Sequence, residues 1–225
     1  MNSLCENEGA DESRRSATRG GMLVVVSSPS GGGKGTLIRR ALEIVPNLDY
    51  SVSYTTRLPR PGELNGRDYY FVAKEEFERM RAGGEFLESA CVHNNFYGTA
   101  CAEVERATAS GQDVILEIDV QGAASVAERA REAASVFIFI LPPSFDELAR
   151  RLSARGTENQ SDLQARLKNS RGEVERYTEF DYVVLNDEAE RASKELAAIV
   201  LAERARRERQ IELAKRVLAT FPQNF

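Results

Sequence analysis

The sequence has few of the residues that metal centres and disulfide frameworks require. Among its 225 residues are a single histidine, His93, and only three cysteines, Cys5, Cys91 and Cys101. One histidine excludes a multi-histidine metal centre and suggests no catalytic dyad. Three scattered cysteines are too few for a disulfide framework or a zinc site, so we expect a reducing, cytoplasmic environment.

Long apolar runs and an excess of basic residues are also absent. No apolar run approaches the ~20 residues that span a bilayer, so we expect no membrane segment. Residues 1–20 are polar, carry both charge signs and lack the apolar core of a signal peptide, and we expect a disordered tail there. The formal net charge of −5 argues against a nucleic-acid partner, because duplex binders usually carry a basic face.

The most informative stretch is a glycine-rich turn between an apolar run and a helical pattern. The apolar run Met22–Val26 leads into Ser28, Pro29, Ser30, Gly31, Gly32, Gly33, Lys34, Gly35 and Thr36. In such a turn, backbone N–H groups and the positive end of the following helix point at phosphate oxygens. Lys34 adds an ammonium for the terminal phosphates of a nucleoside triphosphate. We therefore predict a phosphate-binding loop; the alternative is a Gly/Ser-rich surface loop.

The loop departs from the pattern G-x-x-x-x-G-K-[ST] at both ends. Ser28 stands in place of the first glycine, and Gly35 stands in place of the hydroxyl residue that follows the lysine. Thr36, one position later, is the nearest candidate for the magnesium side. Whether Thr36 replaces the missing hydroxyl is left open by the sequence.

The rest of the chain alternates short apolar runs with helical patterns, which is typical of a parallel sheet with crossover helices. We predict strands at Val114–Val120, Val136–Leu141 and Tyr182–Leu185, and helices at Leu37–Ile44, Gly122–Ala134, Phe145–Ala154 and Ser161–Arg176. A small α/β lobe is expected from residue 51 to about residue 99, with strands Tyr69–Val72 and Glu85–Val92 around a helix at Lys74–Ala82. Residues 188 to about 219 are predicted to form one long charged helical stretch, with its start docked on the core and its end solvated or facing a partner.

The segment Ser51–Glu63 combines hydroxyls with two arginines in a turn-rich sequence. It resembles the guanylate kinase family, whose S-x-T-T-R-x-P-R-x-G-E pattern is matched by Ser53–Glu63. The resemblance continues, in the family's order, through Asn65–Tyr69, Glu85–Glu88, Tyr97–Thr99, Asp119–Gly122 and Arg155–Glu158. It covers about residues 22 to 200.

The resemblance implies an α/β fold: a P-loop three-layer core with a parallel sheet, an inserted lobe that binds a nucleoside monophosphate, and a helical lid. We expect a guanylate kinase-like domain over residues 21–202 and a charged helical extension over 203–225. Within the domain the expected core is 21–50, 100–145 and 178–202, the GMP-binding lobe is 51–99, and the lid is 146–177.

For the acceptor nucleotide, the resemblance assigns the phosphate to a quartet of guanidinium and phenol groups: Arg57, Arg60, Tyr69 and Tyr97. It assigns the base to Glu88, Ser53, Thr99 and Asp119. A carboxylate at residue 88 can accept from both N1–H and the 2-amino group of guanine, whereas adenine presents an acceptor at N1. Taken singly, the arginines could be solvated and Glu88 could be a surface strand glutamate.

For the donor nucleotide, the resemblance implies that Lys34, Arg151, Arg155 and Arg166 act on ATP and the transferring phosphoryl group. Arg150, Arg171 and Arg176 are expected to be surface residues. Glu117, where the family commonly has aspartate, and Thr36 are the candidate magnesium-side residues. The pair Asn186–Asp187 resembles the loop that meets the adenine and suits a helix cap before Glu188 equally well.

The resemblance therefore predicts Mg²⁺-dependent transfer of the ATP γ-phosphoryl group to GMP, giving GDP and ADP. The alternatives are a kinase for another nucleoside monophosphate and a non-catalytic binding module. The expected partners are ATP and GMP, without nucleic acid or membrane, and the expected state is a monomer or homodimer.

Overall fold

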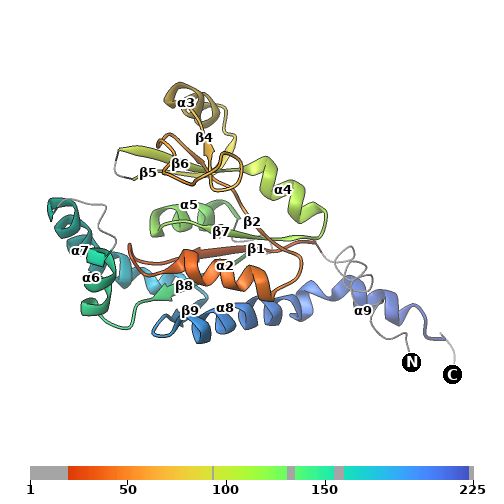
Figure 1. The fold of residues 1–225 in the computed structure, drawn as a ribbon. Coiled ribbons are helices and arrows are strands. Elements are labelled where there is room, and N and C mark those ends of the chain that lie inside the picture. Colours follow the sequence, from red (N-terminus) through yellow and green to blue (C-terminus); the bar gives the residue numbers. More distant parts are fainter. Residues whose placement is uncertain (1–19, 93, 131–134, 155–159, 223–225) are drawn as a thin grey trace, which may run out of the picture.

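The computed structural model describes residues 20–92, 94–130, 135–154 and 160–222. Its main sheet has five parallel strands in the order β2-β7-β1-β8-β9 (Figure 1). The strands are β1 (Leu23–Ser27), β2 (Leu48–Tyr50), β7 (Asp113–Glu117), β8 (Ser135–Leu141) and β9 (Tyr182–Leu185). Val26 of β1 lies opposite Glu117 of β7, so the loop after β1 and the end of β7 share one edge of the sheet.

Helices cover both faces of this sheet, which suits strands such as β1 and β8 that are apolar on nearly every residue and β7 that is apolar at its three central residues. Buried residues of α2 (Lys34–Ile44) and α8 (Ala189–Arg204) pack on one face, and those of α4 (Cys101–Ala109) and α5 (Val120–Ala130) pack on the other. The result is a three-layer α/β core with a parallel sheet, as the sequence predicted.

A second sheet of four strands, in the order β4-β3-β6-β5, forms the upper part of the molecule in Figure 1. Its strands are β3 (Tyr54–Thr55), β4 (Tyr70–Phe71), β5 (Phe86–Val92) and β6 (Asn95–Ala100), and α3 (Lys74–Ala82) packs on it. The small core of this lobe is aromatic, with the Phe77 and Phe86 rings stacked at 4.5 Å.

Two further helices, α6 (Phe145–Ala154) and α7 (Gln160–Glu175), lie together at the left of Figure 1. A short 3-10 helix, η1 (Arg176–Glu179), leads from α7 into β9. After α8 come η2 (Arg207–Arg209) and α9 (Ile211–Leu218), and α9 projects beyond the main sheet (Figure 1). None of the helices in the described ranges combines the length and apolar character that a bilayer crossing requires.

Several predicted elements are confirmed with their bounds: the strand Tyr182–Leu185 and the helices Lys74–Ala82 and Phe145–Ala154. The strand predicted at Val114–Val120 is wrong at its end. It stops at Glu117, because Asp119 Oδ1 accepts the Gly122 N–H at 2.7 Å and so caps α5, which begins at Val120. The end of the helix predicted at Gly122–Ala134 lies partly outside the described residues.

The helical stretch predicted from residue 188 to about 219 is present but not continuous, because η2 separates α8 from α9. Gln210 Nε2 donates to the Arg204 carbonyl at 2.7 Å, a side-chain contact that ends α8 without glycine or proline. The elements β2, β3, β6 and α4 were not predicted. The division into core, lobe, lid and extension stays a prediction, although α8 continues past residue 202 to Arg204. Most of the predicted N-terminal tail lies outside the described residues.

Candidate functional site

The glycine-rich turn lies between β1 and α2, as predicted for a phosphate-binding loop. Gly33, directly before α2, has φ +88°, and a Cβ there would lie 2.5 Å from Asn186 Nδ2. Only glycine combines this backbone conformation with that close approach. Earlier in the loop, the Gly32 N–H and the buried Ser28 hydroxyl both donate to the Pro29 carbonyl at 2.9 Å. The loop is therefore curled tightly by its own contacts.

Asn186 supports this loop from the end of β9. Its buried Nδ2 donates to the Gly32 carbonyl at 2.8 Å, and its backbone carbonyl accepts from Arg151 Nη2 at 2.9 Å. Of the pair Asn186–Asp187, Asn186 contacts the loop, whereas Asp187 Oδ1 accepts the N–H of Glu188, the N-cap residue of α8, at 2.6 Å. A contact between Asn186 and adenine stays a prediction.

Helix α7 reaches the loop from the other side. The Ser30 N–H donates to Glu173 Oε2 at 2.9 Å, and Arg166 Nη1 lies 3.5 Å from Ser30 Oγ. On α6, Arg151 Nε donates to Glu147 Oε1 at 2.7 Å, and hydrogen bonds from Arg150 and Arg151 lower the pKa of Glu147 to about 2. Arg151 is thereby aimed at the loop and Arg150 remains an exposed partner of Glu147. Arg155 lies outside the described residues.

A cleft of about 670 Å³ lies between the loop, the end of β7 and the second sheet. It brings together half of the predicted site residues, which come from separate parts of the chain: Ser30, Lys34, Ser53, Arg57, Arg60, Tyr69, Glu88, Tyr97, Glu117, Asp119 and Arg166. The cleft thus joins the Lys34 ammonium, three arginines and, with Glu63 included, four carboxylates in one space.

Glu88 is a buried carboxylate in this cleft, with 4% of its surface exposed. Thr99 Oγ1 donates to Glu88 Oε1 at 2.8 Å, and Ser53 Oγ lies 3.5 Å from Thr99 Oγ1. Burial raises the pKa of Glu88 to about 7, with a further increase from Asp119 and an opposing decrease from the Thr99 hydrogen bond. Thr99 is itself fully buried, so it acts behind Glu88. The surface-glutamate alternative for Glu88 is excluded.

The Arg57 guanidinium is fixed by Glu63 and by aromatic rings. Its Nη2 donates to both Glu63 carboxylate oxygens at 2.9 Å, and its Cζ lies 5.4 Å from the centre of the Tyr69 ring. Burial lowers the pKa of Arg57, but the hydrogen bonds and the charge of Glu63, with a smaller contribution from Tyr97, together outweigh burial and the net shift is upward. The Tyr69 and Tyr97 rings meet edge to face at 5.9 Å. Three predicted phosphate-binding side chains therefore lie side by side.

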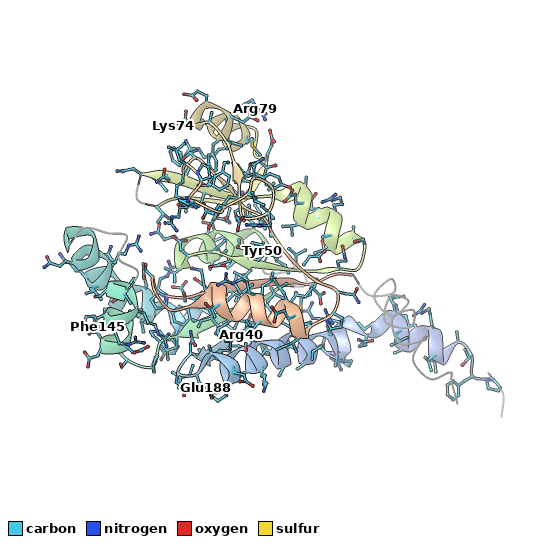
Figure 2. The ribbon with its side chains drawn as sticks, viewed as in Figure 1. Arg40, Tyr50, Lys74, Arg79, Phe145 and Glu188 are labelled. Atoms are coloured by element: carbon cyan, nitrogen blue, oxygen red, sulfur yellow. The ribbon has the colours of Figure 1, made fainter. Side chains whose placement is uncertain are left out.

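Glu117 lies at the end of β7 beside the loop lysine. Its Oε1 is 4.0 Å from Lys34 Nζ, and its Oε2 accepts from the Tyr50 hydroxyl at 3.3 Å. Figure 2 labels Tyr50 near the centre of the molecule. Burial, followed by the nearby Glu117 carboxylate, raises the pKa of Tyr50, so its phenol is present as a hydrogen-bond donor. Thr36, in contrast, is exposed in the first turn of α2 and is not among the residues that line the cleft.

Sequence reasoning gave no role to Glu63, Tyr50 or Glu173, each of which holds a predicted site residue. Glu63 stands inside the segment that resembles the family, so its position was the available signal. Tyr50 and Glu173 have no motif of their own. Within the part of the chain that the structure describes, no group of three or more His, Cys, Asp or Glu side chains is arranged to hold a metal.

Comparison with known proteins agrees with this geometry. The family model described as "Guanylate kinase" matches residues 20–203. The chain is 45% identical over 201 residues to a guanylate kinase of Geobacter sulfurreducens, covering 89% of this chain and 98% of the relative. It is 52% identical over 196 residues to that of Neisseria meningitidis, covering 87% of this chain and 95% of the relative.

A solved structure gives the same result. The crystal structure of guanylate kinase from Anaplasma phagocytophilum is similar with a TM-score of 0.76 and 38% identity, covering 92% of this chain and 98% of that chain. The family model, the curated relatives and this solved structure each match most of the chain. The chain belongs to the guanylate kinase family.

Proposed function

We propose that this protein transfers the γ-phosphoryl group of ATP to GMP, giving ADP and GDP. The observation that carries the proposal is the buried Glu88 carboxylate in the same cleft as Lys34 and Arg57. A carboxylate with one oxygen bound to Thr99 still has acceptor capacity for two adjacent donors. The N1–H and 2-amino groups of guanine are such a pair, and burial makes an unmatched base costly.

The acceptor phosphate is proposed to bind Arg57, Arg60, Tyr69 and Tyr97. Arg57 is held by Glu63, so its guanidinium is oriented before the nucleotide arrives. Guanidinium groups suit the geometry of a phosphate dianion, and the phenols add donors. Ser53, Thr99 and Asp119 would complete the base site around Glu88.

The donor phosphates are proposed to bind the loop from Ser28 to Thr36, with Lys34 against the terminal phosphate and Asn186 toward adenine. Arg151, Arg155 and Arg166 would neutralise the transferring group. An oxygen of the GMP phosphate attacks the γ-phosphorus, the bond from that phosphorus to the β,γ-bridging oxygen breaks, and the negative charge moves onto the ADP leaving group. Lys34 and the arginines align the two anions and stabilise this charge. Closure of α6 and α7 would exclude the water that could otherwise hydrolyse ATP.

The residues at the end of β7 suit a magnesium ion that is shared with ATP. Glu117 offers a carboxylate next to Lys34, and oxygen ligands are what Mg²⁺ requires. Because the described residues offer no cluster of three or more metal-binding side chains, phosphate and water oxygens would complete the coordination. The ion would supply neutralisation of the phosphate charge. We propose Glu117 and, on the exposed first turn of α2, Thr36 as its protein partners.

In the cell, this reaction would return GMP to the diphosphate pool as part of purine nucleotide metabolism, and we place it in the cytoplasm. We propose that the protein acts as a monomer or homodimer and has no nucleic-acid or membrane partner.

A coupled assay with GMP, AMP and UMP tests the substrate. We expect GMP to be the fastest acceptor, and faster turnover of AMP or UMP would refute the specificity. Lys34→Ala should reduce kcat at least ~100-fold with little change in melting temperature. A non-catalytic binding module would show no turnover, and calorimetric titration with ATP separates that alternative from an inactive preparation.

A further inference from the structure

Gly35, which departs from the usual phosphate-loop pattern, and Glu117, which stands where the resemblance places aspartate, lie against each other in the structure. A Cβ at residue 35 would lie 3.1 Å from each carboxylate oxygen of Glu117 and 3.5 Å from its Cδ. The two contacts with oxygen are tighter than ordinary van der Waals packing. The volume that a serine or threonine at residue 35 would fill is therefore taken by the Glu117 carboxylate.

This carboxylate is held in place by contacts on both sides. Tyr50 donates to Oε2 at 3.3 Å, and Lys34 Nζ lies 4.0 Å from Oε1. The side chain is 27% exposed and lines the cleft, so it remains accessible to a bound ion. An aspartate at residue 117 is one methylene shorter, and its carboxylate would end short of the space beside residue 35.

We propose that Glu117 supplies the oxygen that a hydroxyl at residue 35 supplies in the usual loop, and that Gly35 and Glu117 are therefore functional only as a pair. Gly35 provides the room, and the longer side chain of Glu117 brings the metal-binding oxygen into it. The divalent-ion role rests on the proposed function, whereas the dependence of one residue on the other is a property of the protein itself.

A double-mutant cycle tests the pair, with variants Gly35→Ser, Glu117→Asp and Gly35→Ser/Glu117→Asp. The first readout is the melting temperature without ligand or metal. Gly35→Ser alone should lower it by about 5 °C because the new side chain overlaps Glu117. In the double variant we expect at least half of that loss to be recovered. The proposal would be overturned if Gly35→Ser lowered the melting temperature by the same amount in the wild-type protein and in the Glu117→Asp variant.

The second readout is binding of Mn²⁺ in the presence of ADP, followed by the electron paramagnetic resonance of free Mn²⁺. Each single variant should bind Mn²⁺ about fivefold more weakly or worse, and the double variant should return to within about twofold of the wild type. Additive losses in the double variant would overturn the proposal. The proposal would also be overturned if Thr36→Val weakened Mn²⁺ binding and Glu117→Asp did not. That result would identify Thr36 as the residue that binds the ion.

A further variant separates the steric effect of a side chain at residue 35 from the effect of its hydroxyl group. Gly35→Ala adds only a Cβ, so with Glu117→Asp it should regain thermal stability but not Mn²⁺ binding. Recovery of Mn²⁺ binding in Gly35→Ala/Glu117→Asp would overturn the proposal that Glu117 replaces a metal-binding hydroxyl at residue 35. A wild-type protein that fails to phosphorylate GMP would refute the proposed function, while the metal-free melting cycle would still report on Gly35 and Glu117.

Discussion

Glu88 is the residue at which stability and specificity oppose each other most directly. Its carboxylate is 4% exposed and accepts a hydrogen bond from the Thr99 hydroxyl, so its charged form is poorly solvated in the cleft. A guanine would add two further donors to this carboxylate. Burial of Glu88 therefore lowers the stability of the fold and increases the selectivity of the site for guanine.

The pH dependence of catalysis should report this residue. Because the pKa of Glu88 is raised to about 7, the carboxylate that accepts from guanine is lost as the pH falls. We expect kcat/KM for GMP to fall about tenfold between pH 8 and pH 6. The GMP phosphate titrates in the same range, so the profile of Glu88→Gln provides the control. A wild-type profile no steeper than that of the variant would contradict the role of Glu88.

The pH dependence of stability at residue 88 should run opposite to that of catalysis. The folded-state pKa of about 7 lies above the usual 4.5, so the stabilising contribution of protonated Glu88 is present below pH 4.5 and is lost as the pH rises through 7. A neutral glutamine avoids the buried charge. We expect the variant to be more stable than the wild type at pH 8, by at most about 3 kcal/mol, and to lose that advantage toward pH 5. Urea unfolding at both pH values measures the difference, and an advantage that grows toward low pH would exclude this account.

At the scale of elements, the sequence predicted the central architecture because the buried strands carry a simple pattern. Tyr182–Leu185 and Val136–Leu141 are short apolar runs between helical patterns, and both occur as strands. The elements that were missed lack such a pattern. Asn95–Ala100 includes asparagine, glycine and threonine, and it is a strand because it pairs with β5 and β3. Cys101–Ala109 buries only Val104, so no apolar stripe marks it as a helix.

The candidate site divides in the same way. The loop around Lys34 and the segment containing Arg57 are contiguous motifs, so they could be predicted from the sequence. Tyr50 and Glu173 act because β2 and α7 place them beside Glu117 and Ser30, at separations of 67 and 143 residues. No local pattern encodes such contacts, because they depend on where the elements pack.

The contact between α7 and the phosphate loop predicts an effect on ATP binding. Glu173 accepts the Ser30 N–H at 2.9 Å and places a negative charge at a group expected to face phosphate. We expect Glu173→Gln to bind ATP roughly threefold to tenfold more tightly, because repulsion between carboxylate and phosphate is removed. Calorimetric titration measures this affinity. Glu175→Gln, which changes the exposed partner of Arg171, is the control and should leave the affinity unchanged. Weaker binding by Glu173→Gln would show that the carboxylate supports the loop instead.

At the scale of the whole molecule, one buried ion pair connects distant parts of the chain. The fully buried Asp113 accepts the Met22 N–H and Arg204 Nε, both at 2.7 Å. Arg204 also donates to the Pro46 carbonyl at 2.7 Å. The end of α8 is thereby attached to β7, to the residue before β1 and to the segment after α2.

Removing Arg204 should therefore destabilise the entire fold. Arg204→Ala removes the Arg204 guanidinium from the buried Asp113 carboxylate, and we expect a loss of about 3 kcal/mol in the free energy of unfolding. Arg207→Ala, which breaks the exposed pair with Glu208, should change it by less than ~0.5 kcal/mol. Denaturant unfolding of both variants measures the contrast. Similar values for the two variants would mean that the Arg204 pair contributes no more than a surface pair.

The separate hydrogen bonding of the two sheets has a consequence for the width of the cleft. One wall of the cleft comes from the five-stranded sheet and the other from the four-stranded sheet, with no strand shared between them. Hydrogen bonds between strands stiffen each sheet internally, whereas the two sheets are linked to each other by the chain segments that join them and by α5, where Arg129 Nη1 donates to the Phe86 carbonyl of β5 at 2.9 Å. We expect the width of the cleft to change when a molecule contacts both sheets. Small-angle X-ray scattering should then give a smaller radius of gyration when both nucleotides are bound than when neither is.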